Sequence, residues 1–115
     1  MTATTFNLEA VQDACNEAAQ AARTAAKEMI AKYGDRGACG FAWVNIYGVR
    51  SNSKLGTALK AAGFRKDYTG SLQLWNPSQA AVQSLDILEA GAYAYAEVIK
   101  AKLGLEKVYA GSRMD

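Results

Sequence analysis

Two segments of the chain alternate between aliphatic side chains and aromatic or polar ones. In residues 40–47 the alternating sets are Ala42, Val44 and Ile46 against Phe41, Trp43, Asn45 and Tyr47. In residues 71–75 they are Leu72 and Leu74 against Ser71, Gln73 and Trp75. Successive side chains of a β-strand point to opposite faces of its sheet. Both segments are therefore predicted to be strands, with one aliphatic face for the core and one aromatic and polar face.

A different period precedes the first strand. Small and apolar side chains recur at spacings of three and four at Leu8, Val11, Cys15, Ala18, Ala22, Ala25 and Met29. This spacing is typical of one face of a helix, which is predicted to run to about Tyr33. Asn7 can cap its start and Gly34 can end it. The many alanines on this face permit a neighbouring helix or sheet to approach closely.

Two further helices and a last strand complete the pattern. A short helix is predicted from about Lys54 to Ala62, ended by Gly63 with Phe64 folding back on Leu59. The tetrad Asn76-Pro77-Ser78-Gln79 has the residue types of a helix start, so the third helix is predicted to begin there and to continue to Gly104. A short strand is expected over residues 107–110.

The order helix, strand, helix, strand, helix, strand predicts an α/β fold, with α+β as the alternative, in one globular domain spanning residues 1–115. A small three-stranded sheet is expected to pack with the alanine-rich first helix and the long third helix. The middle helix suits a right-handed crossover between parallel strands, and antiparallel pairing is the alternative. Three strands leave two unprotected edges, which association through an edge or through the aromatic face would cover.

The aromatic and polar face is the first candidate site, as a surface for a ligand or a partner. Its residues are Trp43, Asn45, Tyr47, Gln73 and Trp75. Rings beside amides resemble surfaces on which bases or other planar ligands stack. The alternatives are burial under the middle helix and burial in a homo-oligomer, because monomers rarely leave large apolar patches exposed. The two amides favour an interface, since a buried amide must find hydrogen-bond partners.

A basic segment is the second candidate, as a site for an anion. It comprises Arg50, Ser51, Ser53 and Lys54 before the middle helix and Arg65 and Lys66 after it. Free N–H groups at a helix start, hydroxyls and cations suit an anion. The segment lacks the glycine and lysine pattern of a phosphate loop, and plain capping by Ser51 or Ser53 is the alternative. With 13 basic and 11 acidic residues, a polycation that coats nucleic acid is not favoured on net charge.

Catalysis is the least favoured function class, and we expect no cofactor. The chain has no histidine, the commonest general base and nitrogen metal ligand. Cys15 and Cys39 lack metal-ligand spacing and are expected to be reduced and buried. An enzyme would need tyrosine, lysine or carboxylate chemistry. No leader and no run of about 20 apolar residues is visible, so a cytoplasmic protein without a membrane partner is expected.

The closing residues 109–115 are a third candidate. A frayed polar tail is the default at a terminus. Arg113 and Asp115 follow the last strand directly, so they are alternatively placed at the rim of the sheet, where they would form a salt bridge or contact a partner.

Three stretches carry a resemblance to a known group. They are Gly40-Phe41-Ala42-Trp43-Val44, Leu74-Trp75-Asn76-Pro77-Ser78 and Ala110-Gly111-Ser112-Arg113-Met114-Asp115. Together they resemble small uncharacterised proteins of tailed bacteriophages and prophages, over roughly residues 37–115. That group has no assigned activity, so the resemblance implies no site residue. It implies an accessory protein that works inside a bacterial cell and binds a host protein, a nucleic acid or a small signalling molecule.

The sequence thus favours a non-enzymatic binding module that self-associates and uses the aromatic and polar sheet face. The expected partner is another copy of the chain, with a host protein or an anionic ligand as further classes. Binding of an anion or nucleic acid by the basic segment is the first alternative. A small enzyme without histidine chemistry is the second.

Overall fold

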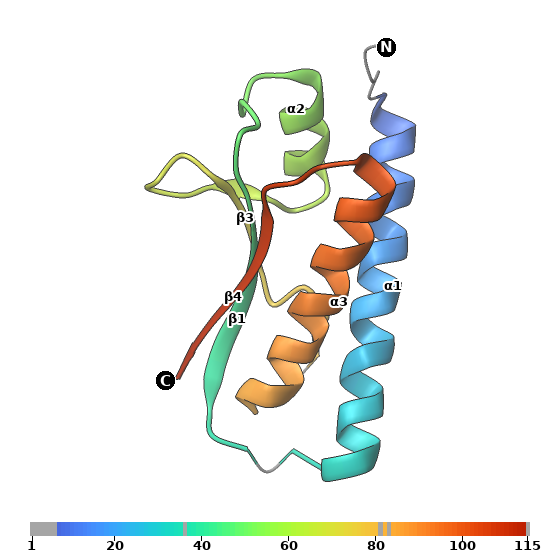
Figure 1. Ribbon diagram of the computed structural model, residues 1–115, viewed down its shortest axis with the longest axis vertical. Helices are drawn as coiled ribbons and strands as arrows, with labels where there is room; N and C mark the ends of the chain where they lie inside the picture. The colour runs from blue at the N-terminus through green and yellow to red at the C-terminus, as the bar shows by residue number, and fades with distance from the viewer. Residues whose placement is uncertain (1–6, 36, 81, 83, 115) are drawn as a thin grey trace.

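The computed structural model describes residues 7–35, 37–80, 82 and 84–114. Within them the chain forms α1 (Leu8–Tyr33), β1 (Gly40–Ile46), α2 (Lys54–Ala61), β2 (Arg65–Lys66), β3 (Leu72–Trp75), α3 (Leu85–Leu103) and β4 (Val108–Met114). Figure 1 shows α1 and α3 running side by side, with the sheet along one flank of α3. The three predicted helices are therefore present, and the expected strands are joined by a further one.

The sheet has four strands in the order β2-β3-β1-β4, and every neighbouring pair is antiparallel. The prediction of three strands was wrong because β2 consists of Arg65–Lys66, two exposed residues without any apolar alternation. Parallel pairing was also wrong, since β3 lies between the two strands that α2 connects. From β1 to β4 the element order is β-α-β-β-α-β, the connectivity of a split β-α-β unit, with α1 added in front. The fold is therefore a small α+β domain.

The core lies between the sheet and the helices. The inward side chains of the sheet include Val44, Ile46, Leu72 and Val108, all almost completely buried. They form one cluster with buried side chains of all three helices, so the described helices pack on the same face of the sheet. α3 contacts β1 and β4 directly, whereas α1 packs against α3 and α2 (Figure 1). The opposite face of the sheet carries no described helix.

The alanine stripe of α1 has the role that its composition suggests. Ala18 and Ala22 are fully buried, and α3 approaches them through Gly91. A Cβ added to Gly91 would lie 3.4 Å from the carbonyl oxygen of Ala22 and 2.8 Å from the Cβ of Ser78. Small side chains on both helices therefore permit their close packing, as predicted.

The helix ends follow the predicted local chemistry except at the start of α3, and α1 and α3 end at Gly34 and Gly104 as predicted. The Asn7 side chain accepts a hydrogen bond from the Ala10 N–H at 2.7 Å and caps α1. At the end of α2, Gly63 has a φ of 112° and the Phe64 N–H donates to the Leu59 carbonyl at 3.1 Å. This is the predicted Schellman closure.

The third helix begins at Leu85, eight residues after its predicted start at Pro77. The Asn76 N–H donates to the Ala42 carbonyl, so the sheet hydrogen bonds continue into the tetrad. Asn76 and Gln79 both have positive φ, and the Gln79 N–H closes a turn on Asn76. Asparagine tolerates this left-handed conformation, and its side chain competes with helical hydrogen bonds. Residues 76–79 therefore form a turn, although their residue types are typical of a helix start.

Candidate functional site

The face of the sheet opposite the helices is the candidate site, and we call it the outer face. Its outward side chains are those of Phe41, Trp43, Asn45, Tyr47, Arg65, Gln73, Trp75, Tyr109 and Arg113, and Gly111 occupies an outward position of β4. Trp75 and Tyr109 are about half exposed, at 49% and 53%. The middle helix α2 packs on the other face, so it does not bury these rings within the described chain. All five residues assigned to this face from the sequence are brought together there.

The two tryptophans form the centre of the outer face. Trp43 and Trp75 are direct cross-strand partners in β1 and β3, with ring centroids 5.0 Å apart. Phe41 meets Trp75 edge-on at 5.9 Å, and the Arg113 guanidinium carbon lies 5.8 Å from the centre of the Phe41 ring. Cross-strand aromatic pairs and such cation–π contacts are stabilising. The result is a continuous aromatic surface with a cation at its corner.

Gly111 in β4 sets the position of Trp43. It pairs with Trp43 on the side opposite Trp75. A Cβ added to Gly111 would lie 2.5 Å from the indole Nε1 and 2.7 Å from Cε2. The indole therefore lies directly over the glycine backbone, and no larger residue fits beneath it. This contact accounts for the lower exposure of Trp43 compared with Trp75.

The other half of the outer face is polar. The Trp75 indole N–H donates to the Gln73 Oε1 at 2.6 Å, and the Asn45 amide donates to the Tyr47 hydroxyl at 3.4 Å. Tyr47 and Tyr109 form a second ring pair with centroids 5.9 Å apart. The Asn45 Oδ1 is enclosed and accepts no hydrogen bond from any described residue. This half thus carries hydrogen-bonding groups beside rings.

The charge of the outer face is one-sided. Arg65 is the cross-strand partner of Gln73 at the β2 edge, and Arg113 lies beside Phe41 at the β4 edge. None of the outward side chains of the four described strands is acidic. The face therefore combines exposed rings with positive charge at two separated positions.

The structure divides the predicted anion site into separate parts. Arg50, Ser51 and Lys66 line an open hollow of about 610 Å³. Ser53 is occupied as the cap of α2, because its hydroxyl accepts from the Gly56 N–H and donates to the Arg50 carbonyl. Lys54 is exposed in the first turn of α2, and Arg65 belongs to the outer face. Only part of the segment therefore forms a common cavity.

The two cysteines differ from each other. Cys15 is buried as expected, and burial raises the pKa of its thiol, partly offset by a hydrogen bond with Tyr95. The expectation that Cys39 is buried was wrong, because it is exposed and precedes β1 in an isolated bridge to Ser84. Among the described residues, no three His, Cys, Asp or Glu side chains are grouped to hold a metal ion. No helix in the described ranges is long and apolar enough to cross a membrane.

Two residues of the outer face were missed because the last strand was predicted too short. β4 continues to Met114, so Gly111 and Arg113 lie within the sheet. The sequence signal is weak, since Ala110 to Arg113 show no strong apolar alternation. The default expectation of a frayed tail was wrong for Arg113, which belongs to the edge strand β4 and contacts Phe41.

Comparison of the chain with protein-family models, with curated proteins and with solved structures finds no match. The resemblance to bacteriophage proteins therefore stays a prediction.

Proposed function

We propose that the chain is a non-enzymatic binding module whose outer face binds single-stranded nucleic acid. The observation that carries the proposal is the adjacent pair of half-exposed Trp75 and partly buried Trp43 on the two central strands, on the sheet face that no described helix covers. In the bacteriophage context that the sequence suggests, such a module would be an accessory protein inside the bacterial cell.

Stacking supplies the main interaction. Every base has a π-face, and stacking on an aromatic side chain contributes about 1–3 kcal/mol per base. Four-stranded sheets with aromatic side chains on their central strands recur as surfaces for two or three bases of single-stranded RNA. Trp43 and Trp75 occupy the corresponding central strands, and Tyr109 extends the surface onto β4. A duplex would not offer unstacked bases to these rings.

Charge and hydrogen bonding support the same ligand. Arg65 and Arg113 lie at opposite edges of the sheet, where the phosphates of a strand that crosses the face would pass. Gln73 and Asn45 are cross-strand neighbours between the rings and Arg65. Amide side chains pair readily with base edges. The outer face thus offers rings for stacking on the bases, amides for the base edges and arginines for the phosphates.

Self-association is the second candidate, and the edge of β4 favours it more than the outer face does. Face-to-face pairing of two copies would place the positive charges of Arg65 and Arg113 from both copies in one interface, without an outward carboxylate from the described strands to offset them. β4 is a seven-residue strand paired only with β1 among the described strands. An edge of this kind pairs readily with another strand. Pairing of β4 with a second copy would leave the outer face open.

A binding titration tests the proposal. Fluorescence anisotropy of a labelled 10-nucleotide oligouridine and of a labelled oligothymidine would be measured with the wild type, Trp43→Ala and Trp75→Ala. Each substitution should weaken binding by about 5- to 150-fold, the equivalent of one lost stack. The matched control is Tyr68→Ala, because Tyr68 is 99% exposed in the β2–β3 turn, away from the outer face.

Three outcomes would contradict the proposal. They are no binding of either oligonucleotide at micromolar protein, equal losses in Tyr68→Ala and the tryptophan variants, or a greater loss in Arg50→Ala with Lys66→Ala than in either tryptophan variant. The third outcome would show that nucleic acid binds at the hollow lined by Arg50, Ser51 and Lys66. Light scattering after size-exclusion chromatography tests self-association separately, and a strict monomer at micromolar concentration would exclude a stable dimer.

A further inference from the structure

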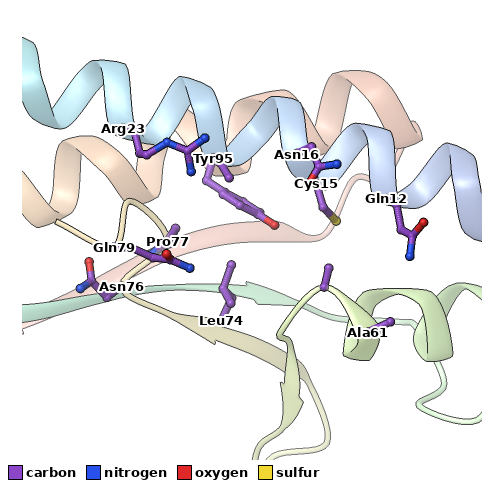
Figure 2. Close-up of a pocket in the computed structure, with 12 residues that line it drawn as sticks. Gln12, Cys15, Asn16, Arg23, Ala61, Leu74, Asn76, Pro77, Gln79 and Tyr95 are labelled. Carbon is purple, nitrogen blue, oxygen red and sulfur yellow. The ribbon is translucent and has the colours of Figure 1, made fainter.

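A groove on the helical side of the molecule is separate from the outer face. It has a volume of about 370 Å³ and lies between α1, the end of α2, the end of β3 and the turn that follows β3. In Figure 2 the side chains of Gln12, Asn16 and Arg23 extend from α1 along one side, and those of Asn76 and Gln79 lie on the opposite side. The volume is within the range of small-molecule sites, about 300–1,000 Å³.

The polar residues on α1 form a stripe of their own. Gln12, Asn16, Ala19 and Arg23 are spaced by four, three and four residues, so they share one face of the helix. This stripe lies beside the buried alanine stripe that packs on α3. Gln12, Asn16 and Arg23 are exposed, so they form the solvent-facing rim of the groove and do not serve the packing of the core.

Arg23 supplies an uncompensated positive charge to the groove. Its guanidinium donates to the Gln20 Oε1 at 2.9 Å, and no described carboxylate forms an ion pair with it. None of the residues that line the groove is acidic. Guanidinium groups bind carboxylates and phosphates through paired hydrogen bonds. The charge of the groove therefore suits an anionic group on the ligand.

The floor of the groove carries neutral hydrogen-bonding groups. Cys15 from α1 and Tyr95 from α3 are buried side by side and hydrogen-bonded to each other (Figure 2). Burial raises the pKa of both groups, so both stay protonated at neutral pH. Leu74 from β3 adds an apolar contact. The floor can thus receive the uncharged part of a ligand.

The wall opposite α1 contains backbone strain. Asn76 has a φ of 48° and Gln79 a φ of 55°, and they are the two non-glycine residues with positive φ in the described chain. Both line the groove. Such residues concentrate at functional sites, where strained backbone holds side chains in place. Here the turn places Gln79 at the groove, whereas the Asn76 amide is engaged within the turn, where it donates to the Ala80 carbonyl and accepts from the Ser78 hydroxyl.

We infer that this groove binds a small organic anion, with its carboxylate or phosphate on Arg23 and its polar body between the amides of α1 and the amide of Gln79. The site does not depend on nucleic-acid binding by the outer face. Its residues come from α1, α2, β3, α3 and the turn, and none is an outward residue of the sheet.

Thermal unfolding with three probes tests this inference. Inorganic phosphate, citrate and adenosine 5′-monophosphate would each be added at 10 mM to the wild type, with ionic strength held constant by sodium chloride. A ligand that binds the folded chain raises Tm, and millimolar affinity should raise it by about 3 °C or more. A rise with citrate alone indicates a carboxylate ligand, and a rise with either phosphate compound indicates a phosphate ligand.

Two variants locate the site. Arg23→Gln removes the charge at an exposed position, and Ala19→Leu places a larger side chain in the groove, so both should abolish the rise. Lys27→Gln, an exposed cation of α1 that lines neither the groove nor the outer face, is the matched control and should keep the rise in full. The inference is overturned if no probe raises Tm, if the rise persists in Arg23→Gln, or if Lys27→Gln abolishes it.

Discussion

Gly111 tests whether the position of Trp43 matters for ligand binding. Replacement by alanine adds one methyl group, which would lie 2.5 Å from the indole Nε1 of Trp43. Because non-bonded atoms do not approach so closely, the indole must move. It would then lose its contact with the β4 backbone and its arrangement against Trp75, 5.0 Å between ring centroids. The substitution thus disturbs the aromatic surface without removing a ring.

The loss of binding free energy caused by Gly111→Ala cannot exceed the contribution of one base stacked on Trp43. Full loss of stacking on Trp43 would cost about 1–3 kcal/mol, or about 5- to 150-fold in Kd. Gly111→Ala should therefore weaken oligouridine binding by about tenfold. The free energy of unfolding should change by less than about 1 kcal/mol, because alanine suits a strand better than glycine and the indole can move toward solvent.

A double-mutant cycle shows whether Gly111→Ala weakens binding through the Trp43 indole. Gly111→Ala would be measured in the wild type and in Trp43→Ala, by anisotropy for binding and by urea unfolding for stability. In the Trp43→Ala background the alanine has no indole to displace, so it should have no further effect on binding. The near-ultraviolet circular dichroism of Gly111→Ala should also differ from that of the wild type without ligand, because the packing of the indoles changes.

Two results would contradict this role of Gly111. Wild-type affinity in Gly111→Ala would show that the position of Trp43 is not important for binding. An equal loss with and without the Trp43 indole would show that the alanine acts on the backbone of β4.

Three further predictions concern the fold. Ser53→Ala should lower the free energy of unfolding by about 1 kcal/mol because it removes the cap of α2. The control Ser51→Ala should change the free energy of unfolding by less than about 0.5 kcal/mol. Equal values for the two variants in urea unfolding would exclude the capping role of Ser53. Ala22→Leu should destabilise the chain by about 1–3 kcal/mol because it forces α1 away from Gly91, and an unchanged urea midpoint would contradict the close packing. Hydrogen bonds from the Thr69 hydroxyl and from the N–H groups of Thr69 and Ser71 lower the pKa of Asp67. Its stabilising effect is therefore present above the unfolded pKa of about 3.9 and is lost as pH falls through the lower folded pKa. Asp67→Asn should show a weaker loss of stability than the wild type as pH falls below about 4, and identical acid profiles would contradict this.

Local patterns in the sequence predicted most of the fold. The alternation in β1 and β3, the spacing in α1 and the Gly63 closure each depend on neighbouring residues, and each is present. β2 could not be predicted in this way, because Arg65–Lys66 joins the sheet only through β3. The start of α3 was misplaced since the Asn76 N–H bonds to Ala42 in β1, a tertiary contact that overrides local helix signals.

In the candidate site, too, local patterns predicted some residues, whereas others depend on contacts between distant parts of the chain. Trp43, Asn45, Tyr47, Gln73 and Trp75 follow from alternation, so their common face could be predicted. The position of Arg65 on that face depends on the register between β2 and β3. The contact of Gly111 with Trp43 depends on the register between β1 and β4, which lie more than 60 residues apart in the sequence. The groove requires four elements to converge, and no local pattern specifies that.

The indole N–H groups of the two tryptophans report directly on whether nucleic acid binds the outer face. Trp43 and Trp75 are the only tryptophans in the chain and both lie on the outer face, so the two indole N–H signals in a ¹H–¹⁵N spectrum report on this surface alone. Titration with oligouridine at constant protein concentration should shift both signals to saturation, and an equal concentration of a duplex should shift them far less. If both signals stay in place while other amides shift, nucleic acid binds elsewhere and the account of the outer face is wrong.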